Sequence, residues 1–256
     1  MDRLFGHDRF TVTPRRGELF VFDKLARPQV PVIVLPVPSK VGKGVLVSPT
    51  IYGNVMLGPT AEDLDDKTMT GTSEEGFAFL LEKGERLMPS LLDEEVTATY
   101  AGLRAAIDAD DYLIDLDAAR RYVLVGGIRS TGLTASMAIA EHVHELLAEG
   151  SDLVLTERDD LPEPPRMPNL GEAGLRPYQD ASRITDDPDY GRMVCFCERV
   201  SAGELRDAFA STIPPVDLDG LRRRTRVMIG RYQGFYCGAH AQVLLASHGE
   251  ARGARR

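Results

Sequence analysis

Short apolar segments bounded by Pro, Gly and Asn fill the first half of the chain and predict strands. The predicted strands cover residues 18–23, 31–35, 44–48, 54–57 and 95–100. In the last segment, Val96, Ala98 and Tyr100 alternate with polar residues and therefore share one face of the strand. Residues 10–126 are thus expected to be β-rich.

One amphipathic helix interrupts these strands. Its start is indicated by Thr72 and Glu75, which have the spacing of a capping box. Apolar residues follow at the helical period and form a stripe for packing against a sheet, namely Phe77, Leu80, Leu81 and Leu87. The first half of the chain therefore predicts an α+β arrangement.

A second helix follows the last predicted strand, after a glycine-rich turn. Tyr122–Val125 is a short apolar run typical of a covered strand, and the helix is expected over residues 133–149. The turn contains Gly126, Gly127 and Gly132, which lack the side chains that would keep a ligand away from the backbone.

The start of this second helix is a candidate binding site. Ser130 or Thr131 can cap the helix, and its N-terminal N–H groups and dipole favour an electron-rich group. Such a turn suits a phosphate, a carboxylate or the pyrimidine end of a flavin. An ordinary strand-to-helix connection has the same spacing, so the pattern alone leaves both interpretations open.

Composition narrows the class of protein. The 256 residues are enough for one large or two small domains. Hydrophobic residues make up 43% and charged residues 27%, which is typical of a soluble globular protein, and a net charge of −9 argues against nucleic acid as the main partner. We find no apolar run of roughly 20 residues that would predict a transmembrane segment, and no signal peptide. Three cysteines are too few for a disulfide framework, which favours a reducing cytoplasm.

The turn and several other motifs resemble one family of proteins. Gly127–Thr134 resembles the C-terminal flavin-contacting motif of FAD-dependent oxidoreductases of the D-amino-acid-oxidase superfamily. The similarity is to their glycerol-3-phosphate dehydrogenase-like and 2-hydroxyglutarate oxidase-like branch. Supporting matches, in the family's order, are Pro14–Glu18, Pro49–Asn54, Leu57–Ala61 and Ala101–Arg104. Together the matches cover most of residues 10–150.

The resemblance implies a fold and a cofactor for residues 1–150. The expected fold is the mixed-sheet substrate domain of such a flavoprotein, ending in a strand, a turn and a helix. FAD would be contacted by Gly126, Gly127, Ile128, Ser130, Thr131, Gly132, Leu133 and Thr134. Hydride would pass from the CH–OH of a hydroxy acid or polyol phosphate to the flavin, so no catalytic side chain is assigned.

The same resemblance assigns residues to an anionic small-molecule substrate. Arg104 would pair with the carboxylate or phosphate, because its planar guanidinium donates two parallel hydrogen bonds. Arg129, inside the turn, would contact a substrate anion or a flavin carbonyl, and Tyr52 would line the pocket. A surface arginine and an exposed turn tyrosine are the alternatives.

One part of the family's pattern does not occur in the sequence. Members open with a strand, a GxGxxG turn and a helix that hold the ADP half of FAD, and the chain contains no such motif. We therefore expect that the dinucleotide-binding part is on a separate FAD-binding chain, or that the chain is a truncated product.

The second half of the chain begins with a different composition. Proline and acidic residues predominate over residues 151–190 and predict an extended linker. Beyond it, residues 191–250 predict a small all-α module. Ser201 and Glu204 form a capping box for a first helix, and two more are expected after Pro214 and from about Ala239.

Three cysteines mark this module as a candidate metal site. Cys195, Cys197 and Cys237 are predicted near helix N-termini, where the dipole stabilises a thiolate. The segment resembles the bacterioferritin-associated-ferredoxin-like [2Fe–2S] module that is fused behind many of these oxidoreductases. Tyr232 occupies the position of the fourth ligand, and His240 would complete a Cys₃His set that also suits zinc. The alternative is a metal-free module whose cysteines are small buried apolar residues.

We therefore hypothesise that the chain is the C-terminal portion of an FAD-dependent oxidoreductase that is similar to glycerol-3-phosphate dehydrogenases. Two alternatives stay open. One is a non-catalytic subunit for electron transfer or interaction, and the other is an inactive remnant.

Overall fold

The structure, a computed structural model, describes residues 1–37, 44–164 and 174–253. Its contacts divide the chain into two units. Unit 1 comprises Met1–Glu94 and Thr99–Leu161, and unit 2 comprises Glu95–Ala98 and Pro162–Arg256. Each unit has a hydrophobic core of its own.

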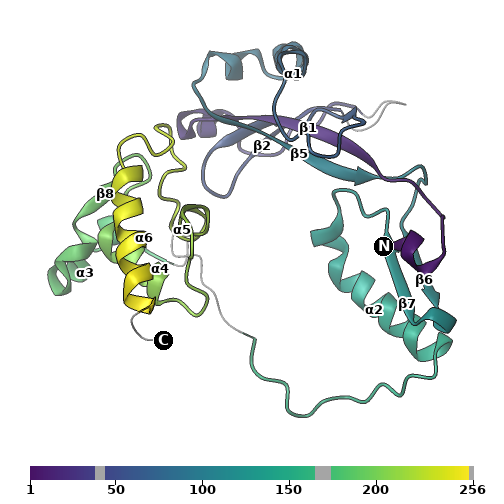
Figure 1. Ribbon diagram of the computed structural model, residues 1–256. Helices are drawn as coiled ribbons and strands as arrows, with labels where there is room; N and C mark the ends of the chain where they lie inside the picture. The colour runs from purple at the N-terminus through teal and green to yellow at the C-terminus, as the bar shows by residue number, and fades with distance from the viewer. Residues whose placement is uncertain (38–43, 165–173, 254–256) are drawn as a thin grey trace. The chain divides into compact units, whose positions relative to one another are not determined.

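Unit 1 is built on a five-stranded sheet (Figure 1). Its strands are β1 (Thr13–Phe22), β2 (Leu46–Pro49), β3 (Val55–Gly58), β4 (Glu62–Asp63) and β5 (Val96–Ala106). The order is β2-β3-β1-β4, and β5 also pairs with β1. The pairs β1–β3, β1–β4 and β2–β3 are antiparallel. The predicted strands are confirmed except for residues 31–35, where Val34 forms only an isolated bridge with Val47.

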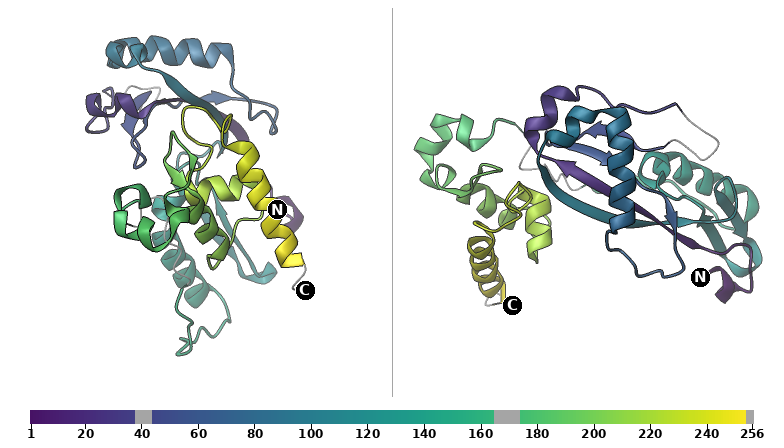
Figure 2. Two further views of the ribbon diagram at one scale, coloured as in Figure 1. Left: turned by 90° about the vertical axis from the view of Figure 1, so that its left-hand side faces the viewer. Right: turned by 90° about the horizontal axis from the view of Figure 1, so that it is seen from above.

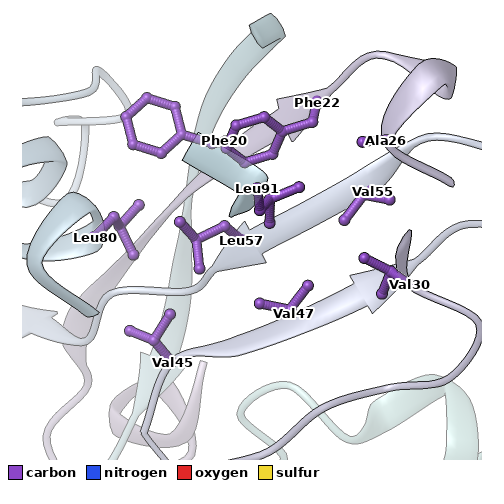
Figure 3. Packing of buried hydrophobic residues seen from close by; sticks show 10 residues of the cluster. All are labelled: Phe20, Phe22, Ala26, Val30, Val45, Val47, Val55, Leu57, Leu80 and Leu91. Carbon is purple, nitrogen blue, oxygen red and sulfur yellow. The ribbon is translucent and has the colours of Figure 1, made fainter. Parts of the chain in front are cut away.

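Helix α1 (Glu74–Leu87) covers one face of this sheet and continues into the 3₁₀ helix η3 (Pro89–Asp93) (Figures 1 and 2). It begins after Ser73, whose hydroxyl accepts the Gly76 N–H, and not at the expected Thr72. Fully buried Leu80 belongs to the same core cluster as the sheet residues Phe22 and Leu57 and lies beside Leu57 (Figure 3). Leu81 is 46% exposed, so its assignment to the buried stripe was wrong.

The end of unit 1 is a strand, a turn and a helix, as expected. β6 (Leu113–Asp117) and β7 (Tyr122–Gly126) form an antiparallel hairpin, with η4 (Ala118–Arg120) between them. Helix α2 (Gly132–Gly150) follows and contacts β6.

The N-terminal segment of the chain packs on the same hairpin, after the short helix η1 (Asp2–Phe5). The Phe5 ring stacks on Tyr122 at 4.2 Å between centroids, and His7 Nε2 lies 2.8 Å from Asp117 Oδ2. A further 3₁₀ helix, η2 (Lys24–Gln29), follows β1. Residues more than a hundred positions apart thus hold this end of unit 1 together.

Unit 2 is mainly helical. Its elements are η5 (Pro177–Gln179), α3 (Ala181–Asp186), η6 (Pro188–Tyr190), β8 (Met193–Cys195), β9 (Val200–Ser201), α4 (Ala202–Ala210), α5 (Leu218–Thr225) and α6 (Gly238–Gly253). The capping box of Ser201 and Glu204 is confirmed at the start of α4. The short β8–β9 hairpin shows that the prediction of an all-α module was wrong.

Part of the expected linker is folded. Residues 177–190 form η5, α3 and η6, which contact one another in sequence, and η6 packs against α4. Tyr190 donates a 2.8 Å hydrogen bond to Asp207, and Arg183 lies 3.3 Å from the same carboxylate. These contacts explain why a Pro- and Asp-rich stretch is ordered here. Residues 165–173 of the expected linker lie outside the described residues.

Candidate functional site

The turn between β7 and α2 needs glycine at one position for its own geometry. Gly127 has φ +71°, and a Cβ built there would lie 2.6 Å from Ile107 Cδ1 and 3.1 Å from the Asp111 carbonyl. Both the left-handed backbone and the close packing exclude a side chain. Gly127 is therefore explained by the fold itself and carries no evidence for a ligand.

Gly132 differs from Gly127 in this respect. It is the first residue of α2, and an added Cβ would meet only Ile128 Cγ2, at 3.2 Å. Apart from this contact, the space on the Cβ side of Gly132 is open. Ser130, Leu133 and Thr134 are exposed around it. This is the accessible helix start that the glycine pattern predicted.

The expected cap of α2 is absent in this part of the structure. Thr131 occupies the N-cap position but makes no side-chain hydrogen bond to the helix. Its hydroxyl donates to the Ile128 carbonyl at 2.8 Å and lies 2.5 Å from the Tyr112 hydroxyl. The prediction of Thr131 as a capping side chain was therefore wrong. The positive end of the α2 dipole is left without a protein side chain at its cap.

Arg129 lies in the same turn, in the left-handed region with φ 58°. Its side chain is exposed, and Nη2 donates to the carbonyl of Ala109 in the β5–β6 connection. This bond ties the turn to the preceding loop. Arg129 therefore holds the shape of the turn and also presents a positive charge beside the start of α2.

Arg104 lies on β5, on the sheet face opposite α1. Its Nη2 donates to the carbonyls of Thr60 at 2.6 Å and Arg16 at 3.3 Å, and it packs directly on Gly17. Burial lowers the pKa of its guanidinium, and the neighbouring charge of Arg15 lowers it further, whereas the charge of Asp63 opposes this shift. None of the hydrogen bonds that the described structure gives it goes to a carboxylate. Arg104 is thus a cation held in place by neutral carbonyl groups.

The same face carries a residue that sequence reasoning had not assigned to the site. Tyr100 lies four residues before Arg104 on β5 and therefore points to the same side of the sheet. Its hydroxyl lies 3.5 Å from Met56 Sδ, and burial raises the pKa of its phenol. The alternation of Val96, Ala98 and Tyr100 was the available signal. Tyr52, by contrast, is half-buried in the β2–β3 turn.

Cys195 and Cys197 lie at the end of β8 and in the turn that follows it, and their sulfurs are 3.6 Å apart. All three thiols were expected near helix N-termini. Only Cys237 directly precedes a helix, α6, whereas Cys195 and Cys197 lie in the β8–β9 hairpin. Backbone N–H groups of Met228 and Glu198 donate to the Cys195 sulfur. Burial raises the pKa of both thiols, and these N–H groups oppose that effect at Cys195.

The residues expected to supply the fourth ligand, Tyr232 and His240, are both exposed. The Tyr232 backbone N–H donates to the Cys197 sulfur, while its ring is 48% exposed and packs edge-on against Tyr236. His240 is exposed on α6. Across residues 1–37, 44–164 and 174–253, no three His, Cys, Asp or Glu side chains are placed to ligate a metal ion. The donor set therefore does not fit a [2Fe–2S] cluster.

Comparisons with known proteins decide the family. The family model for FAD-dependent oxidoreductases (DAO) matches residues 1–146. The chain belongs to this family. Among curated members, a glycerol 3-phosphate dehydrogenase of Caloramator mitchellensis is 32% identical over 248 residues, which are 96% of this chain and 51% of that protein. A glycerol 3-phosphate oxidase of Mycoplasma genitalium is 32% identical over 143 residues, which are 55% of this chain and 37% of that protein.

A solved structure shows a similar partial match. It is an L-α-glycerophosphate oxidase from Mycoplasma pneumoniae with FAD bound, with a TM-score of 0.52 and 32% identity, covering 62% of this chain and 42% of that one. The chain thus spans about half the length, or less, of these oxidoreductases. Among the helices in the described ranges, none combines the length and apolar character that a membrane crossing requires.

Proposed function

We propose that this chain is the substrate-binding and flavin-contacting portion of an oxidoreductase acting on glycerol 3-phosphate or a similar polyol phosphate or hydroxy acid. The observation that carries the proposal is the open start of α2 beside Gly132, where a cap side chain is missing. The names of the relatives support the substrate class. Their FAD-bound member supports the cofactor.

The flavin-contacting residues are proposed to be Gly126, Gly127, Ile128, Ser130, Thr131, Gly132, Leu133 and Thr134. Backbone N–H groups at the start of a helix stabilise an electron-rich group, such as the pyrimidine end of a flavin. FAD, when bound, supplies the hydride acceptor. The protein's own contribution is a rigid turn, held by Gly127 against Ile107 and by Arg129 on the Ala109 carbonyl.

Arg104 is proposed to bind the anionic group of the substrate. Its position is fixed by hydrogen bonds to carbonyls and not to a carboxylate, so a phosphate or carboxylate gains a charge-assisted hydrogen bond there. Arg129 and Tyr52 are proposed as further substrate contacts. In this role Arg104 orients the substrate, and the barrier to hydride transfer falls because the reacting CH is held in place.

The proposal is tested with substitutions in the turn. They are made in a fusion protein in which this chain is joined to the dinucleotide-binding domain of a relative. Gly132→Val is expected to lower flavin occupancy, because a valine blocks approach to the backbone of α2. Thr131→Ser is the matched control, since it keeps a hydroxyl at the same place, and should retain flavin. Equal occupancy in both variants, measured by visible absorbance after gel filtration, would show that the turn is only a connector.

The 256-residue chain by itself is expected not to retain FAD. It contains no GxGxxG unit for the ADP half of the cofactor. A flavin spectrum that survives gel filtration of this chain would contradict the expectation.

A second candidate is a non-catalytic subunit that completes a separate FAD-binding chain. The exposed length of α2 favours a neighbour there, since none of its residues is buried in the described structure. Co-purification of a flavin-containing chain from its source cells would support this candidate. Release of product from glycerol 3-phosphate by the joined chain described above would support the enzyme.

Unit 2 is proposed to be a former cluster module in which Tyr232 is the defect. Tyr232→Cys is expected to allow a [2Fe–2S] centre to be reconstituted with Cys195, Cys197 and Cys237, whereas the unchanged chain should reconstitute poorly or bind zinc weakly with help from His240. Iron and sulfide analysis after anaerobic reconstitution measures this. A stoichiometric cluster in the unchanged chain that is lost in His240→Ala would instead make His240 the fourth ligand.

The free thiols support a cytoplasmic location.

A further inference from the structure

Unit 2 contains a pair of neighbouring thiols in Cys195-Phe-Cys197. Their sulfurs are 3.6 Å apart, close enough for one S–H to donate to the other sulfur. A disulfide requires about 2.05 Å between the sulfurs. The two side chains therefore point toward each other, and a short approach would join them.

The surrounding backbone keeps the two sulfurs in this position. N–H groups of Met228 and Glu198 donate to the Cys195 sulfur, and the N–H of Tyr232 donates to the Cys197 sulfur. Gly230 leaves space for the Cys197 sulfur, because a Cβ built at Gly230 would lie 2.5 Å from it. A segment more than thirty residues further along the chain thus packs around this pair.

The two thiols differ in accessibility. Cys195 is 1% exposed and belongs to the core of unit 2, whereas Cys197 is half-buried in the turn after β8. A reagent from solution therefore meets Cys197 first. Cys195 is then the neighbour that can react with whatever forms on Cys197. Cys237 is buried at the start of α6.

We propose that Cys195 and Cys197 of the metal-free protein form a dithiol that closes to an intramolecular disulfide by exchange with a low-molecular-weight disulfide. The Cys197 thiolate attacks one sulfur of the reagent, so that a mixed disulfide forms and one thiolate leaves. The Cys195 thiolate then attacks the Cys197 sulfur, the second reagent thiolate leaves, and the two protein protons end on the two released thiols. The dithiol is oxidised by two electrons and the reagent disulfide is reduced by two.

This inference does not depend on the flavin. It does give the module a two-electron chemistry that needs no fourth metal ligand, which is the ligand that Tyr232 fails to supply. In a reducing compartment the open dithiol is the resting form. Closure to the disulfide then indicates that the thiol–disulfide potential of the compartment has become more oxidising.

The test incubates the full-length chain, freed of metal by a chelator and fully reduced, with oxidised glutathione. Free thiols are expected to fall from three to one. The intact mass should fall by two hydrogen atoms, and peptide mapping should link Cys195 to Cys197. In Cys195→Ser, a stable glutathione adduct should remain on Cys197, because the second attack is no longer available. Cys237→Ser should close like the unchanged chain.

Three results would overturn the proposal. They are a lasting glutathione adduct on Cys197 of the unchanged chain, three thiols that stay free, and a link from Cys237 to either partner. Far-ultraviolet circular dichroism of each variant separates loss of chemistry from loss of fold. Metal analysis of the protein as purified distinguishes this proposal from the metal proposal for unit 2. A bound metal that blocks closure until it is chelated supports both, and failure to close after chelation overturns only the disulfide.

Discussion

Helices α1 and α2 of unit 1 show how differently two amphipathic segments can be used. α1 buries Gly76, Leu80 and Gly84 against the five-stranded sheet. α2 is longer, yet none of its residues is buried, and Leu133 and Met137 are 93% and 75% exposed. The difference lies in what each helix packs against. A complete sheet face lies under α1, whereas α2 contacts a hairpin of two strands.

The two helix starts differ in the same way. The start of α1 is filled by the protein itself, since Glu18 is fully buried there and its Oε1 accepts the Ser73 N–H at 2.5 Å. Gly76 is essential to this arrangement, because a Cβ at that residue would lie 1.6 Å from Glu18 Oε2. The start of α2 has no such side-chain anion or cap within the described residues. The first helix start serves stability, and the second is available to a ligand.

The largest expected difference between the helices is in packing energy. Leu80→Ala should lower the free energy of unfolding by about 2–5 kcal/mol, because it leaves a cavity in the core. Leu133→Ala, at the exposed start of α2, should change it by no more than about 0.5 kcal/mol. Urea denaturation of the full chain, followed by circular dichroism, measures both. Similar losses in the two variants would show that α2 is packed as tightly as α1.

The buried carboxylate at the start of α1 gives the next largest effect. Glu18→Gln keeps the shape but places an amide group where Ser73 donates, which should cost about 1–3 kcal/mol of unfolding free energy. Glu75→Gln, in the exposed first turn of the same helix, is the matched control and should cost a few tenths of a kcal/mol. If both variants unfold at the same urea concentration, Glu18 does not stabilise this helix start.

The exposed side of α2 should be detectable with a hydrophobic dye. Its apolar residues form a surface without a covering element in the described structure, so the chain is expected to bind the dye and to self-associate. Met137→Glu should reduce the dye fluorescence with little change in unfolding free energy. Phe79→Glu on α1 is the control, because Phe79 is 42% exposed on a helix whose other face packs on the sheet, with the Lys83 ammonium 5.0 Å from its ring. A monodisperse monomer without dye binding would contradict this expectation.

The smallest effect concerns an ion pair at the edge of the α1-covered sheet. Arg15 donates to Asp63 at 2.6 and 2.9 Å and holds the pKa of that carboxyl below its usual range. Because the folded-state pKa is lowered, the stabilisation is present above the unfolded value of about 3.9 and is lost as pH falls through the folded value. Both side chains are largely exposed, so the effect should stay below about 1 kcal/mol.

Asp63→Asn is the variant that isolates this pair. Its unfolding free energy should fall less steeply than that of the unchanged chain between about pH 4 and pH 2. Urea denaturation at a series of pH values measures the two slopes. Parallel curves would show that the ion pair makes no contribution.

Local patterns in the sequence were sufficient for most of the elements. Alternation and helical spacing predicted β5, α1 and α2, and the capping box of Ser201 and Glu204 was confirmed. The strand expected at residues 31–35 was wrong, although its composition was suitable. These signals work because a helix turn or a cap is made by residues within about four positions of one another.

The sites depended on contacts between distant residues. The sequence indicated which residue types lie in the glycine-rich turn, but only the fold shows that Gly127 is required by Ile107 whereas Gly132 opens to solvent. The sequence showed two cysteines separated by one residue, while N–H groups that hold their sulfurs come from Met228 and Tyr232. The availability of a partner segment likewise decided that residues 31–35 do not form the expected strand and that residues 177–190 are folded. A sequence determines local hydrogen bonding and periodicity directly, whereas pairing between distant segments depends on the whole fold.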